Sequence, residues 1–165
     1  MLWGALILQI VLIFFNGVFA SAEIAVISAN ETKIQKMAEK GDRRAKRIIK
    51  LTSQPARFLS TIQVAITLAS FLGGAFAADN FAEPLVSLIM KTGIPVPRAV
   101  IHSVCVILIT LILAYFSIVF GELIPKRIAM KKAEKMSLGL SGILRFVSVV
   151  FAPIVWLLTV SANGV

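Results

Sequence analysis

The chain has 165 residues, of which 58% are hydrophobic, and its formal net charge at pH 7 is +9. Water-soluble domains of this size have fewer apolar residues and shorter apolar runs, so the composition excludes an ordinary soluble fold. The single cysteine, Cys105, excludes an intrachain disulfide, and its apolar surroundings favour a small buried side chain.

Three unbroken apolar runs are each long enough to cross a bilayer, which requires about 20 residues of helix. Lipid is spanned by helices or closed barrels, and these runs lack the alternation of barrel strands. The sequence therefore predicts a single all-α integral membrane domain over 1–165. Its three transmembrane helices are expected at about 2–29, 58–78 and 99–120.

Most of the basic residues lie next to these runs. Nine of the 17 Lys and Arg residues fall within 33–57 and five more within 126–135. Cytoplasmic loops carry such an excess, so we expect both clusters inside the cell and the N-terminus outside. The clusters favour contact with a lipid bilayer that has anionic headgroups, and they do not indicate nucleic acid. We therefore expect a multi-pass protein of the plasma or inner membrane.

The segments between the spans carry further patterns. An Ala-Ser-Ala sequence at 20–22 imitates a signal-peptide cleavage site, but the basic cluster follows the run and favours a retained helix. Residues 31–52 are predicted to form one basic amphipathic helix on the cytoplasmic side. After the second span, Pro84 is expected to break the chain and leave 84–90 as a short apolar piece on the outer surface.

Residues 137–160 are open to two interpretations. The segment is apolar and long enough to cross, which would place the C-terminus outside. Arg145 stands near its middle, however, and a charge at the bilayer centre costs about 2.5–3.5 kcal/mol even on lenient insertion scales. A helical hairpin or belt at the inner interface would instead let Arg145 reach the headgroups.

Polar side chains inside the spans are few and share faces. On the first helix, Ser21 belongs to a stripe of small residues, with Asn16 and Glu23 on the neighbouring face. Small-residue stripes pack membrane helices, so packing alone would explain the hydroxyls. A carboxylate such as Glu23 is costly at this depth and marks an ion or proton path. Similar stripes on the second and third helices contain Gln63, Thr67, Ser70 and Gly74, and Ser103, Thr110, Ser117 and Gly121.

The sequence FGELIPKRIA, at 120–129, ends the third run. Glu122 can pair with Lys126 one turn later. Pro125 has no N–H and so leaves the carbonyl of Gly121 without its helical donor. A helix broken there would offer a backbone oxygen beside a carboxylate, and freed carbonyls at membrane depth commonly hold cations.

An intramembrane all-oxygen cation site is therefore the leading hypothesis. Oxygen ligands with few carboxylates suit Mg²⁺ or Na⁺ better than Ca²⁺, and the residues leave those two ions open. The expected ligands are Ser21, Thr67, Ser70, Gly121 and Glu122. The expected structural and pathway residues are Asn16, Glu23, Gln63, Ser117, Pro125 and Lys126.

Three segments occur in an order and spacing typical of one family: NGVFASAEIAVISAN, FLSTIQVAITLAS and FGELIPKRIA. With them, nearly all of 1–160 resembles the transmembrane domain of the CorC/cyclin M family of magnesium transporters, also called haemolysin-C-like proteins. The resemblance implies a homodimer with three transmembrane helices per subunit and a juxtamembrane helical belt at about 126–160. It implies Mg²⁺ export coupled to Na⁺ entry through the ligands named above.

The same resemblance implies a cytoplasmic pair of CBS domains that binds nucleotide in the full-length protein, outside these 165 residues. A non-transporting dimeric membrane anchor or sensor for such a regulatory module is the second function class, with the polar stripes serving packing alone. An enzyme is not expected, because the sequence has no His/Cys/Asp constellation and no HExxH, GxSxG or phosphate-loop motif.

Overall fold

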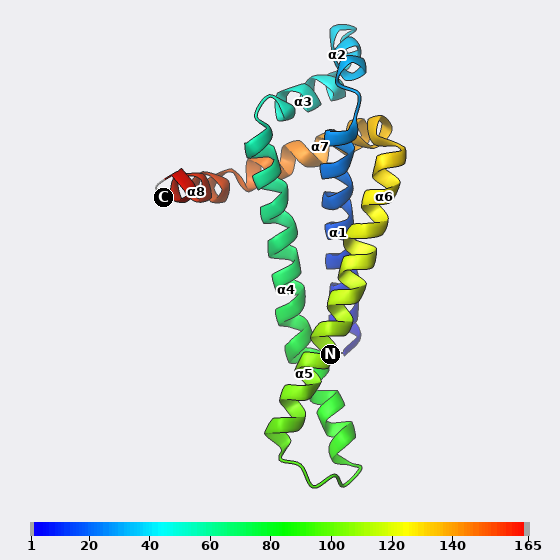
Figure 1. The fold of residues 1–165 in the computed structure, drawn as a ribbon, viewed down its shortest axis with the longest axis vertical. Helices are drawn as coiled ribbons and strands as arrows, with labels where there is room; N and C mark the ends of the chain where they lie inside the picture. The colour runs from blue at the N-terminus through cyan, green and yellow to red at the C-terminus, as the bar shows by residue number, and fades with distance from the viewer. Residues whose placement is uncertain (1, 164–165) are drawn as a thin grey trace.

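The part of the chain described by a computed structural model, residues 2–163, is helical and contains no strand. Met1, Gly164 and Val165, which complete the predicted domain, lie outside it. Three long helices run side by side, and shorter helices lie across one end of them (Figure 1). The all-α membrane architecture predicted from the sequence is confirmed.

Three helical runs in the described residues are long and apolar enough to cross a membrane, as predicted. The first is α1 (Leu2–Ser28) and the second is α4 (Pro55–Met90). The third run joins three consecutive elements: α5 (Arg98–Ile118), a π-helical turn η1 (Val119–Leu123) and α6 (Ile124–Lys131). The chain is therefore a multi-pass membrane protein.

Helix α4 extends beyond the predicted second span. It continues through Pro84 without a break, so the prediction that Pro84 ends the helix is wrong. Pro84 removes one N–H, but membrane helices tolerate such a loss where neighbouring helices support them. Packing supplies that support, because Val86 is fully buried and clusters with Ile101 and Cys105 of α5.

The segment predicted as one basic helix over 31–52 forms two helices, α2 (Glu31–Glu39) and α3 (Arg43–Thr52). Gly41 separates them with a φ of 95°, a left-handed conformation that glycine adopts without a steric penalty. Asp42 then caps α3, because its side chain accepts hydrogen bonds from two backbone N–H groups of the first turn. A turn followed by a cap therefore interrupts the amphipathic pattern.

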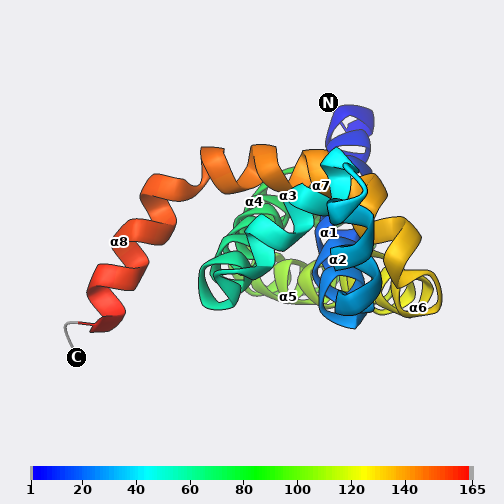
Figure 2. The ribbon, with the colours of Figure 1, turned by 90° about the horizontal axis from the view of Figure 1, so that it is seen from above.

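Helix α7 (Ala133–Val150) crosses the bundle near one end, and α8 (Ala152–Asn163) extends away from it, as Figures 1 and 2 show from two directions. The chain bends by 61° between them, although the pair is apolar enough to form a fourth span. This placement favours the belt interpretation of 137–160. The belt begins with α7 and not at 126, because 126–131 continue the third helix as α6.

The largest buried apolar cluster lies where the short helices meet the ends of α1 and α4. Ile34 of α2, Ile48 of α3 and Leu144 of α7 are each at most 2% exposed. This cluster fixes the crossing helices α2, α3 and α7 to α1 and α4. Its other buried members are Ala22, Val26, Ala38, Ala45, Phe58, Ile62 and Leu138.

Candidate functional site

The third helix widens at the GELIP sequence and does not break. The N–H of Ile124 donates to the carbonyl of Val119, five residues earlier, which is the hydrogen bond of a π turn. The helix then continues past Pro125 to Lys131, so the prediction of a proline-broken helix end is wrong. A π turn shifts the hydrogen-bond register by one residue, and this shift lets the helix pass the N–H that Pro125 lacks.

The π turn approaches α1 closely through two glycines. A Cβ on Gly121 would lie 3.3 Å from the Cβ of Asn16 and 3.3 Å from the carbonyl oxygen of Ile13. A Cβ on Gly17 would lie 3.1 Å from Cγ of Pro125. Because these spaces are too small for a relaxed methyl group, the two glycines set the distance between α1 and η1.

Asn16 lies at this crossing and is 4% exposed. Its Nδ2 donates a hydrogen bond of 2.9 Å to Oγ of Ser70 on α4. Its Oδ1 is buried and has no hydrogen-bond partner among the described residues. A buried acceptor without a donor costs about 1–3 kcal/mol, so this oxygen is a candidate to receive a partner from outside the chain.

Asn16 and Ser70 line a pocket of about 230 Å³ between α1, α4 and α5. Most of its walls are leucine, isoleucine, alanine and glycine, so the polar groups form a narrow seam inside an apolar space. A few polar groups in an apolar pocket are typical of a binding site. The polar lining residues are Gln9, Asn16, Ser70, Thr110 and Ser117.

Two carboxylates share one ammonium group at the α6 end of the site. Nζ of Lys126 lies 2.7 Å from Oε1 of Glu122 and 3.4 Å from Oε2 of Glu23. The contact with Glu122 follows from the i,i+4 spacing, whereas the contact with Glu23 depends on the packing of α1 against α6. The three side chains carry a formal charge of −1 when all are ionised.

Only part of the predicted ligand set meets at Asn16. Ser70 and the glycine of the π turn both contact it. Ser21 is 6% exposed and lies on α1, one turn beyond the glycine that packs on Pro125. Thr67 lies on α4, where its Oγ1 accepts a 3.5 Å hydrogen bond from Nε2 of Gln63.

Within residues 2–163, no three His, Cys, Asp or Glu side chains form a group that could hold a metal ion. A cation in this region would be held by amide, hydroxyl and carbonyl oxygens, with Glu23 and Glu122 nearby. Such a set of hard oxygen ligands fits Mg²⁺ or Na⁺ better than a soft metal.

Comparison with known sequences identifies the fold. Residues 7–165 match the family described as the cyclin M transmembrane N-terminal domain. The chain belongs to this family. The resemblance found in the three sequence segments is thereby confirmed, and the close contact of the π turn with α1 is a feature of this cyclin M domain.

Curated relatives of the cyclin M domain are longer proteins. The chain is 36% identical over 155 residues to a UPF0053 protein of Synechocystis, and the match covers 94% of the chain and 34% of that relative. The chain is 32% identical over 166 residues to a polyamine export protein of Haemophilus influenzae, and the match covers 98% of the chain and 37% of that relative. A polyamine export protein of Salmonella typhimurium is 26% identical over 154 residues, with 93% and 34% covered. The chain thus spans about a third of each relative.

One polar residue of the candidate site, Gln9, was not predicted from the sequence. Gln9 is 8% exposed and lies in the same pocket as Asn16. Its amide packs against Gly73 of α4, where a Cβ would lie 3.2 Å from Oε1. The sequence contains a signal, because Gln9 is an isolated amide in an apolar run and precedes Asn16 by seven residues, about two helical turns.

Proposed function

We propose that this domain transports a cation, and that the ion is Mg²⁺, exported in exchange for Na⁺. The observation that carries the proposal is the buried Oδ1 of Asn16, which has no donor among the described residues. A cation would supply the positive partner that this oxygen lacks, and the adjoining pocket of about 230 Å³ would give it access.

The proposed ligands come from all three long helices. Asn16, Ser70 and Ser117 offer neutral oxygens to the pocket, and Gly121 brings the backbone of the π turn against Asn16. Neutral oxygens bind an ion without holding it permanently, as transport requires. The other candidates are those predicted from the sequence: Ser21, Thr67 and Glu122.

Lys126 would act as a resident counter-ion in the empty protein. Its ammonium group lies between Glu122 and Glu23, so an arriving cation competes with it for both carboxylates. In the orientation favoured by the basic clusters, these carboxylates stand toward the cytoplasmic side and the N-terminus lies outside. Mg²⁺ leaving the cell would meet them before it reaches Asn16.

The test is Mg²⁺ flux through proteoliposomes that contain Asn16→Ala. Loss of a liganding oxygen should reduce flux by about tenfold or more, by analogy with metal sites that lose a positioning group. Asn80→Ala is the matched control, because Asn80 lies on α4 and donates its 2.7 Å hydrogen bond to the carbonyl of Phe76. Equal flux in the two variants would show that Asn16 binds no transported ion.

Polyamine transport is the second candidate function. Two relatives are named polyamine export proteins, and Lys126 presents a primary ammonium group to two carboxylates, as one end of a polyamine would. Spermidine should then compete with Mg²⁺ for transport, and Lys126→Gln should strengthen that competition. If spermidine leaves Mg²⁺ flux unchanged in both proteins, polyamine transport by this domain is contradicted.

We further propose that the domain acts as a homodimer in the plasma or inner membrane, joined to a cytoplasmic nucleotide-binding regulatory domain. The relatives extend well beyond the matched region, which leaves room for such a domain. A purely anchoring role predicts that Mg²⁺ does not raise the thermal unfolding temperature of the purified protein, whereas a bound ion raises it by mass action.

A further inference from the structure

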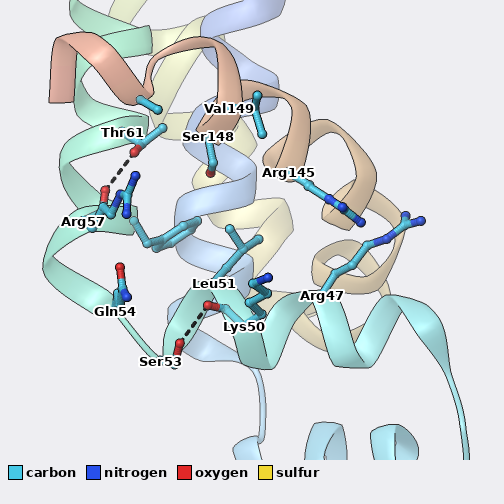
Figure 3. Close-up of a pocket in the computed structure, with 12 residues that line it drawn as sticks. Arg47, Lys50, Leu51, Ser53, Gln54, Arg57, Thr61, Arg145, Ser148 and Val149 are labelled. Atoms are coloured by element: carbon cyan, nitrogen blue, oxygen red, sulfur yellow. Dashed lines mark hydrogen bonds between the residues drawn. The ribbon is translucent and has the colours of Figure 1, made fainter. Parts of the chain in front are cut away.

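A second pocket, of about 490 Å³, lies at the belt end of the molecule. Its walls come from α3, the start of α4, α7 and the first residue of α8, so it is separate from the pocket that contains Asn16. Figure 3 shows its basic side chains around one space. The lining residues are Arg47, Lys50, Leu51, Ser53, Gln54, Arg57, Phe58, Thr61, Arg145, Ser148, Val149 and Ala152.

The lining contains four cations and no carboxylate. Arg47 and Lys50 come from α3, Arg57 from α4 and Arg145 from α7. The ion pairs found among the described residues all involve other side chains. Four like charges around one space repel each other, and an anion placed between them would turn that repulsion into attraction.

The backbone around the pocket also favours an anion. Helix α4 begins at this point, and no side chain caps its N-terminus. The unpaired N–H groups and the positive end of the helix dipole attract negative charge. Arg47 reaches across α7, where a Cβ on Gly142 would lie 3.6 Å from its Nη1, and Figure 3 shows it extending toward Arg145.

The pocket is lined by apolar as well as basic side chains. Leu51, Phe58 and Val149 line it together with the cations. Apolar walls make no favourable contact with a free phosphate ion. A phospholipid carries a charged phosphate next to its acyl chains and can contact both kinds of wall. The pocket also lies where the belt adjoins the transmembrane bundle, because its walls combine α3 and α7 with the first turns of α4. In the orientation that the basic clusters favour, this end of the bundle faces the anionic headgroups of the inner leaflet.

We propose that this pocket binds the phosphate headgroup of one anionic phospholipid, with Arg47, Arg57 and Arg145 as its main partners. Arginine is suited to this role because its planar guanidinium forms paired hydrogen bonds with phosphate oxygens. The bound lipid would tie α3 and α7 to the start of α4. The proposal does not depend on which cation the domain transports.

Native mass spectrometry of the purified full-length protein tests this proposal. Phosphatidylglycerol and phosphatidylcholine are titrated in parallel, and the neutral-headgroup lipid reports non-specific binding. We expect tight retention of one phosphatidylglycerol per subunit by the unaltered protein. The double variant Arg47→Gln/Arg145→Gln should bind it at least about tenfold more weakly.

The matched control is Lys131→Gln/Lys135→Gln, which removes the same charge from exposed positions outside the pocket. Equal loss of phosphatidylglycerol in the two double variants would overturn the proposal, because general surface charge would explain the binding. Saturating inorganic phosphate that displaces the lipid completely would also overturn it, since the site would then be one for free phosphate. If the arginine variant does not fold, Arg57→Gln, at an exposed position, takes its place with the same expected direction.

Discussion

At the scale of single residues, two glycines and one asparagine define the candidate site. Gly17 and Gly121 allow α1 and the π turn to approach closely, and Asn16 is buried in the resulting contact. The sequence identified Gly121 as part of the site but for a different reason, namely a carbonyl freed by Pro125. In the structure, Gly121 allows close contact with α1 because it has no side chain. This contact depends on the partner helix, so the spacing of residues on its own helix does not predict it.

The close approach makes a prediction about Gly121→Ala. The added methyl group would lie 3.3 Å from the carbonyl oxygen of Ile13, so α1 and the π turn must separate. Overpacking of this kind costs about 1–3 kcal/mol, which should lower the thermal unfolding temperature. Gly139→Ala is the control, because its Cβ would meet nothing within 4 Å in α7, and it should stabilise the protein by about 0.4–1 kcal/mol.

The opposite ranking of these two glycine variants would mean that the crossing is not tightly packed. Both substitutions add the same methyl group within a helix, so differences in intrinsic propensity largely cancel. The comparison therefore isolates the contact between α1 and η1.

At the scale of elements, the sequence predicted the spans well because long apolar runs depend on composition alone. It failed at Pro84 and Pro125, where proline was expected to break a helix. Proline removes one hydrogen bond, but packing against a neighbouring helix or a change to π register compensates for that loss locally. The apolar pattern locates neither the neighbouring helix nor the change of register.

The division of 31–52 into two helices could have been predicted from the sequence, because Gly41-Asp42 is a turn followed by a cap. The amphipathic pattern of basic and apolar residues continues on both sides of it and masked the break. For the site, spacing grouped Ser70 and Ser117 on their own helices, but the contact between Asn16 and Ser70 joins α1 to α4. Such contacts require the tertiary fold.

The cap on α3 gives a pH-dependent prediction. A hydrogen bond from the backbone N–H of Arg44 lowers the pKa of Asp42 below its ordinary value of 3.8. A lowered carboxyl pKa stabilises the fold above pH 3.8 and loses that effect as the pH falls through the lowered value. Hydrogen exchange of the α3 amides should therefore be faster in Asp42→Ala than in the parent protein at pH 6.

The difference in exchange between the two proteins should shrink once the solution is acid enough to protonate Asp42. A difference that stays constant down to the lowest pH at which the protein folds would show that the carboxylate charge does not support α3.

At the scale of the whole molecule, the third long helix buries little of its surface inside the chain. Of the residues in its most apolar stretch, between Arg98 and Lys131, 11% are buried, against 39% and 35% in the corresponding stretches of α1 and α4. Its large side chains, such as Phe116 and Ile112, are about half exposed. Lipid and a second copy of the chain are the two surroundings that can cover such a surface. The homodimer inferred from the family resemblance would use part of it.

The proposed dimer can be tested at Gly74. This glycine is exposed on α4, in a small-residue stripe, and a Cβ there would meet nothing within 4 Å in its own subunit. Gly74→Leu should leave each subunit folded but weaken association, because small residues allow close helix contacts between subunits. Association is measured by crosslinking in membranes. The buried Gly17→Leu serves as the comparison, because it disturbs the fold of the subunit itself. The comparison separates loss of association from loss of folding. Unchanged crosslinking of Gly74→Leu would place the dimer surface elsewhere.

We propose above all that a transported cation binds beside Asn16 and the π turn. A structure of the protein with Mn²⁺ in place of Mg²⁺, located by its anomalous scattering, tests the claim most directly. We expect a peak within coordination distance of Oδ1 of Asn16, about 2.1–2.2 Å, and its loss in Asn16→Ala. A peak elsewhere in a protein that still transports Mg²⁺, with none beside Asn16, would contradict the account.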